Sequence, residues 1–93
     1  MRAVCRIHFG DLNQTIHVLN EENDIVNTYK VRTSDLSKFF SKQKIEEAEL
    51  MGPLSFCKKI GNLANEQRKT MYEDLEPIKF IYTREGEKEW VFI

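Results

Sequence analysis

The first third of the chain alternates between apolar and polar residues with a period of two, which is the pattern of a half-buried β-strand. Residues 2–9, 15–20 and 25–32 follow it. Their inward-facing side chains are Ala3, Cys5, Ile7, Phe9, Ile16, Val18, Tyr29 and Val31. The polar stretch "GDLN" at 10–13 supplies the first turn. The pair Asn23-Asp24 supplies the second, because both residues tolerate positive φ. The pattern predicts a three-stranded meander.

At residue 33 the apolar period changes to that of a helix. The candidate N-caps are Thr33, Ser34 and Asp35. One helical stripe of residues 33–51 carries Leu36, Phe39, Phe40, Leu50 and Met51. Ile45 and Ala48 fall off that stripe, so we expect two short helices or one bent helix, ending at Gly52-Pro53. Residues 53–75 predict the longest helix, with an apolar arc of Phe56, Cys57, Ile60, Leu63, Ala64, Met71 and Leu75.

Two further strands are predicted at 77–83 and 87–93, joined by the turn "REGE". Their inward side chains are Phe80, Tyr82, Trp90 and Phe92, and their outward apolar side chains are Ile81, Val91 and Ile93. The order β-β-β-α-α-β-β over residues 1–93 predicts a single α+β domain. We expect a mostly antiparallel sheet with the helices packed on one face.

The chain has 93 residues, of which 41% are hydrophobic and 31% charged, an ordinary globular composition. Its net charge of −1 hides alternating blocks, with −4 over residues 11–24 and +4 over residues 30–44. This alternation argues against a nucleic-acid footprint over the whole surface and leaves room for a local one.

The two cysteines, Cys5 and Cys57, fall on apolar faces and are predicted to be buried. Two cysteines give neither a metal-ligand spacing nor a disulfide framework. The start "MRAVCRIHFG" lacks the apolar region of a signal peptide, and the longest apolar run, "WVFI", is too short to span a membrane. We therefore expect a cytoplasmic protein with reduced thiols and no cofactor.

Both histidines lie on the polar side of the first two strands. With turns at 10–13 and 23–24, the strands would align two rows across the sheet: Arg6, His17, Lys30 and His8, Thr15, Arg32. Such rows offer charge and hydrogen-bond donors to a phosphate, a nucleotide or a nucleic-acid backbone. The alternative interpretation is the solvated face of an antiparallel sheet, where polar residues are expected in any case.

No catalytic, nucleotide or metal motif is complete in this sequence. An acid–base pair of His8 and His17 would lack a pocket and a nucleophile. A metal ion there would lack a third ligand and would be repelled by Arg6 and Lys30. We therefore expect no enzymatic activity. An apolar patch is predicted beside the basic rows, and the open face could then also pair two copies of the chain; the patch comprises Val4, Leu19, Ile81, Val91 and Ile93.

A second candidate surface lies on the long helix. Its stripe consists of Gly61, Asn65, Arg68 and Tyr72, with Lys69 beside it. Because Arg and Tyr are enriched in binding hot spots, this stripe is a candidate protein interface. The alternative is a helix bend at Gly61 with Tyr72 half-buried against the sheet edge.

The sequence favours a small non-enzymatic binding protein that docks on a larger protein as an inhibitor or regulator. The alternative function is nucleic-acid or nucleotide binding through the basic face of the meander. The residues that would carry this alternative are Arg6, His8, Thr15, His17, Lys30 and Arg32.

Overall fold

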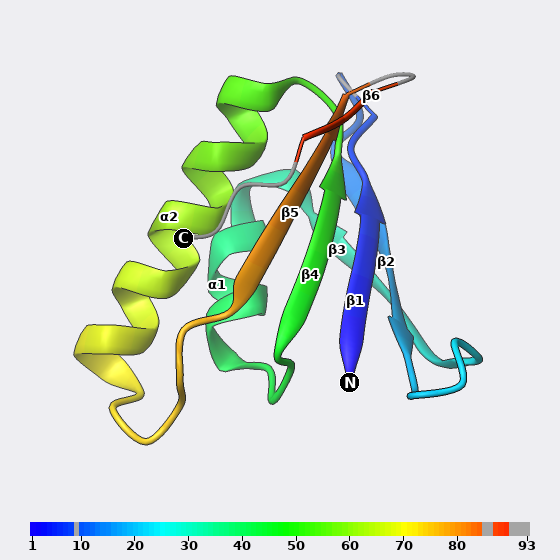
Figure 1. Ribbon diagram of the computed structural model, residues 1–93. Coiled ribbons are helices and arrows are strands. Elements are labelled where there is room, and N and C mark those ends of the chain that lie inside the picture. The colour runs from blue at the N-terminus through cyan, green and yellow to red at the C-terminus, as the bar shows by residue number, and fades with distance from the viewer. Residues whose placement is uncertain (9, 85–86, 90–93) are drawn as a thin grey trace.

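The computed structural model describes residues 1–8, 10–84 and 87–89. Its elements build one six-stranded sheet with the strand order β3-β2-β1-β4-β5-β6 and two helices on one side of it (Figure 1). In chain order they are β1 (Arg2–Arg6), β2 (Asn13–Leu19), β3 (Ile25–Arg32), the 3-10 turn η1 (Thr33–Asp35), α1 (Leu36–Lys42), β4 (Glu47–Met51), α2 (Leu54–Met71), β5 (Lys79–Arg84) and β6 (Glu87–Glu89).

The α+β class and the packing of both helices on one face are confirmed (Figure 1). The predicted elements occur in the predicted order, and β4 is inserted between the two helices. The expectation of a mostly antiparallel sheet is corrected, because β1 pairs with β4 and β4 with β5 in parallel. Parallel neighbours need a crossover connection, and α2 provides the one between β4 and β5.

The helical prediction is wrong for residues 47–51, which form β4. The segment "EAELM" alternates with period two: Ala48 and Leu50 are buried, whereas Glu47, Glu49 and Met51 are half-buried on the other face. Glutamate, alanine and leucine favour helices intrinsically. Here the strands on both sides of β4 supply backbone partners, and this pairing overrides that preference.

The hydrophobic core lies between the sheet and the helices. Ala3, Cys5, Ile7, Ile16 and Val18 are buried there as predicted, and Tyr29 and Val31 pack against it. Of the predicted inward residues, Phe9, Trp90 and Phe92 lie outside the described part of the chain. A series of aromatic contacts links α1 to β5, with Phe40 and Phe80 edge to face at 5.8 Å and Phe80 stacked on Tyr82 at 6.2 Å.

The buried side chain of Arg68 connects the two helices. It is only 3% exposed, and its Nη1 donates to the backbone oxygens of Phe40 at 3.3 Å and Gln43 at 2.9 Å. These carbonyls belong to the C-terminal end of α1, where a cation complements the helix dipole. Burial lowers the pKa of Arg68. The two carbonyls compensate part of the cost of burying the guanidinium, whose Nε is buried without a hydrogen-bond partner in the described part of the chain.

The second hairpin is wider than a two-residue turn. Residues 20–24 connect β2 to β3, with Asn23 at φ 65°, and the Asn20 side chain accepts hydrogen bonds from the backbone of Glu22 and Asp24. A register irregularity lies between Val18 and Leu19, at the end of β2 just before this connection. The resulting alignment differs by two residues from the predicted one, since His17 faces Thr28 instead of Lys30. A shift of two leaves every side chain on its predicted face.

Candidate functional site

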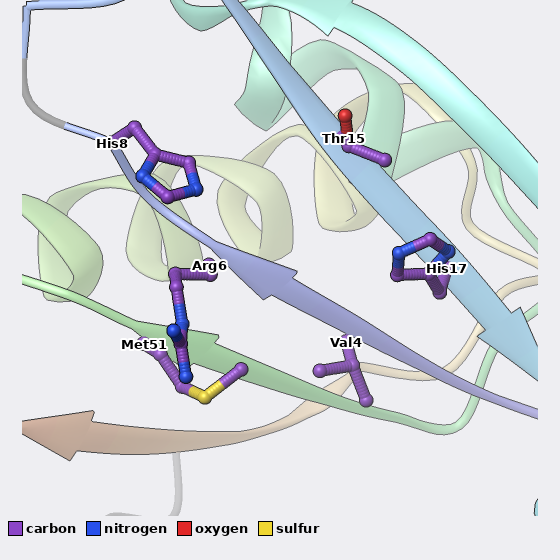
Figure 2. Close-up of a pocket in the computed structure, with 6 residues that line it drawn as sticks. All are labelled: Val4, Arg6, His8, Thr15, His17 and Met51. Atoms are coloured by element: carbon purple, nitrogen blue, oxygen red, sulfur yellow. The ribbon is translucent and has the colours of Figure 1, made fainter.

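A shallow hollow of about 290 Å³ lies on the sheet face that the helices leave open (Figure 2). It is lined by Val4, Arg6, His8, Thr15, His17 and Met51. Four of these six residues belong to the predicted anion site. The side chains come from β1, β2 and β4 and from the residues directly after β1, so strand pairing brings them together.

The predicted cross-strand rows are corrected by the observed register. His17 lies between Val4 on β1 and Thr28 on β3. Thr15 lies opposite Lys30, and Asn13 lies opposite Arg32. The hollow therefore contains Arg6, His8, Thr15 and His17 of the predicted site. Lys30 and Arg32 lie on the same face of the sheet, on β3, outside the hollow.

The first hairpin explains the shift of the β1–β2 register. Backbone N–H of Asp11 donates to the carbonyl of His8 at 3.2 Å, and Gly10 has φ 92°. The chain therefore reverses before Asn13, which already belongs to β2, instead of over residues 10–13. Only glycine adopts such a φ without strain, so Gly10 determines where the chain reverses.

The polar side chains of the hollow are accessible, and Arg6 supplies a permanent positive charge. Arg6, His8 and Thr15 are exposed, and His17 is half-buried, with its Nδ1 3.1 Å from the Thr28 hydroxyl. None of the six lining residues is acidic. Arg6 forms no ion pair with a carboxylate in the described part of the chain. Figure 2 shows the Arg6 side chain extending over β4 beside Met51, its partner in the strand register.

Gln14 positions His8, and sequence reasoning missed it. The Gln14 side chain is 1% exposed; its Oε1 accepts from the His8 N–H at 2.9 Å, and its Nε2 donates to the His8 carbonyl at 3.0 Å. Nε2 also lies 3.0 Å from the Thr33 hydroxyl, which donates to the Asp11 carbonyl at 2.7 Å. A signal was present in the sequence, because Gln14 is a polar residue at the inward parity of Ile16 and Val18.

An acidic strand bounds the hollow on one side. Glu47 and Glu49 of β4 lie on the same face, opposite Arg2 and Val4 of β1. The Glu49 carboxylate accepts a hydrogen bond from the Thr83 hydroxyl at 3.1 Å. The open face therefore carries basic residues on β1 and β3 and acidic residues on β4.

The predicted apolar patch is not formed by the described residues. Leu19 is opposite Arg2, not Val4, and it is 9% exposed. Ile81 faces Glu49 in the register and is 3% exposed. Val91 and Ile93 lie outside the described residues. Val4 remains as a half-buried apolar wall of the hollow.

The candidate interface on α2 is corrected for its first three residues, which face the interior. A Cβ on Gly61 would collide with the Tyr82 hydroxyl and lie 3.2 Å from the Phe80 ring. The Asn65 amide exchanges hydrogen bonds with the backbone of Ile78, at 2.8 and 3.0 Å. Arg68 is the buried link to α1. Gly61 and Arg68 are buried, so they cannot contact a partner, and the half-buried Asn65 uses its amide to hold the helix in place.

The outer surface of α2 carries other residues. Lys69 is exposed and Tyr72, just beyond the helix, is half-buried. Leu63 and Met71, predicted for the core arc, are 38% and 69% exposed. The helix is rotated from its predicted orientation, because Asn65 and Arg68 face neighbouring elements and donate hydrogen bonds to their backbone carbonyls.

Neither cysteine is poised for chemistry. Burial raises the pKa of the Cys5 thiol to about 12, with a further increase from the neighbouring Cys57, and burial raises the pKa of Cys57 to about 11. Both thiols are thus protonated and shielded near neutral pH. The described residues contain no group of three or more His, Cys, Asp or Glu side chains that could hold a metal ion.

Across the described residues, no helix is both long and apolar enough to cross a membrane. Comparison of this chain with protein-family models, with curated proteins and with solved structures finds no match.

Proposed function

We propose that this chain is a small non-enzymatic binding protein whose open sheet face binds phosphate-bearing anions. The supporting observation is the gathering of Arg6, His8, Thr15 and His17 around one hollow, whose lining includes no acidic side chain among the described residues. The guanidinium of Arg6 can donate two parallel hydrogen bonds to phosphate oxygens. The Thr15 hydroxyl and the imidazoles add donors from two further directions.

The dimensions of the hollow limit the ligand. A hollow of about 290 Å³ is at the small end of ligand pockets, so the part of a ligand that it would enclose is a phosphate or pyrophosphate group. The lining includes no serine, cysteine or lysine nucleophile. Binding is therefore proposed instead of catalysis. The buried reduced thiols are compatible with the proposed cytoplasmic location.

Pyrophosphate titration followed by NMR tests the proposal. We expect chemical-shift changes at His8, Thr15 and His17, and an affinity about tenfold lower for Arg6→Ala, because a charge-assisted hydrogen bond contributes about 1.5–3 kcal/mol. Lys59→Ala, which removes an exposed charge from α2, is the matched control and should bind like the wild type. Equal affinities of Arg6→Ala and Lys59→Ala would refute the site.

A larger protein partner is the second candidate, with the chain acting as a regulator or inhibitor. The observation in its favour is the outer surface of α2, where the apolar side chains of Leu63 and Met71 are exposed. Exposed apolar side chains rimmed by charge are typical of interfaces. Affinity capture with the wild type and with Leu63→Glu/Met71→Glu would test it. The candidate fails if both retain the same proteins.

A further inference from the structure

The cations of the open face continue beyond the hollow in one direction. Lys30 lies opposite Thr15 and Arg32 opposite Asn13, both on β3 and both exposed. Neighbouring strands are about 4.8 Å apart, so the series from Arg6 across Thr15 to Lys30 spans about 10 Å. We call Arg6, Lys30 and Arg32, together with the two histidines, the basic track.

In the opposite direction the charge changes sign. Glu47 and Glu49 occupy β4, directly beside β1. The positive charges of the basic track attract a long polyanion, and the carboxylates of β4 repel it. The polyanion is therefore favoured to lie from β1 over β2 to β3 and not over β4. An isolated phosphate in the hollow would make no use of Lys30 or Arg32.

From this distribution, and resting on the proposed function, we infer that the ligand is the phosphodiester backbone of a nucleic acid, which crosses from the hollow over β2 to β3. A span of about 10 Å covers about three phosphates of one strand of a duplex, at about 3.4 Å each along its axis. Arg6 on β1 and the pair Lys30 and Arg32 on β3 therefore lie within reach of neighbouring phosphates of one strand.

The contacts on this face are with phosphates and not with bases. The aromatic side chain of β3, Tyr29, packs against the core on the other side of the sheet. Within the described residues, the hollow is lined by no aromatic ring other than the two imidazoles. Backbone contacts position a protein on nucleic acid without reading its sequence. Binding is therefore independent of base sequence and dominated by counterion release.

Fluorescence anisotropy with a labelled single-stranded oligonucleotide and its duplex tests this inference. Three neutralised phosphates give a slope of about −2 to −3 for the logarithm of affinity against that of salt concentration. Lys30→Ala/Arg32→Ala should lower oligonucleotide affinity about fivefold or more and make the slope shallower by about one to two. The same variant should keep its pyrophosphate affinity, because the hollow is intact.

Lys38→Ala/Lys42→Ala is the matched control, since it removes two exposed charges from α1 on the other side of the sheet. It should bind oligonucleotides like the wild type, and circular dichroism checks the folding of both variants. Binding of either nucleic-acid form with the expected slope supports the inference.

Two results would overturn the inference while the anion site stands. One is pyrophosphate binding with no tighter binding of either oligonucleotide. The other is equally tight binding of polyglutamate of matched charge, which would indicate an acidic protein segment as the ligand. A protein that binds neither pyrophosphate nor oligonucleotide would refute the proposed function itself.

Discussion

At the scale of single residues, Gly61 determines how closely α2 approaches the sheet. It is buried, and the Tyr82 hydroxyl occupies the space where a Cβ would stand. That hydroxyl is itself buried and makes no hydrogen bond within the described residues. A buried hydroxyl without a hydrogen-bond partner destabilises the folded state and so lowers the free energy of unfolding. The two residues therefore form one coupled packing unit.

A double-mutant cycle tests this coupling. Gly61→Ala improves helix propensity by about 1 kcal/mol, yet we expect a net loss of about 1–3 kcal/mol in the free energy of unfolding from overpacking against Tyr82. In the Tyr82→Phe background the colliding oxygen is gone, and Gly61→Ala should cost at least about 1 kcal/mol less. Urea unfolding of the wild type, the two single variants and the double variant measures the cost of Gly61→Ala in both backgrounds. Additive effects would show that the contact carries no strain.

The sequence pattern predicted which residues share the face of the site better than it predicted which residues pair between neighbouring strands. The alternation of β1 and β2 placed Arg6, His8, Thr15 and His17 on one face, and the structure brings these four around the hollow. Alternation says nothing of register, because turn geometry fixes it. The turn at Gly10 and the irregularity at Val18 and Leu19 shifted both pairings by two residues.

At the scale of elements, the three N-terminal strands, α1, α2 and β5 were predictable from periodicity. The strand β4 was not, because five residues of period two were embedded in a segment of good helix formers. In the sequence, the sign of this strand was that Ala48 does not lie on the apolar stripe of the predicted helix. Partners on both sides, β1 and β5, decide the outcome, and these are long-range contacts that local propensity does not contain.

The orientation of α2 was mispredicted because a helical wheel assumes that apolar side chains face inward. Arg68 is buried and Asn65 is half-buried instead, since each finds backbone partners outside α2. Leu63 and Met71 are displaced to the surface as a result. A charged residue is buried only where partners exist, and those partners, Phe40 and Gln43, come from a different part of the chain.

At the scale of the whole molecule, Cys5 on the central strand β1 and Cys57 on α2 are both in the core between the layers. Burial raises the pKa of Cys5 to about 12 and that of Cys57 to about 11, from an ordinary value of 9.0. Above about pH 9 the unfolded chain loses thiol protons that the folded chain still holds. The stability present below that pH is therefore lost as the pH rises toward 11 to 12.

This linkage predicts an alkaline loss of stability that depends on the two thiols. Between about pH 8 and about pH 9.5, the two cysteines together should lower the free energy of unfolding by about 1–2 kcal/mol. Urea unfolding at both pH values measures the loss in the wild type and in Cys5→Ala/Cys57→Ala. The variant starts from a lower stability because of the space it leaves in the core, so the comparison is between the two pH-dependent changes and not between absolute values. Tyr82, which is also buried and has a raised pKa, is present in both proteins and cancels. An identical pH dependence of the two proteins would mean that the thiols are not held in the core in their protonated form, and that β1 and α2 do not enclose them as the fold requires.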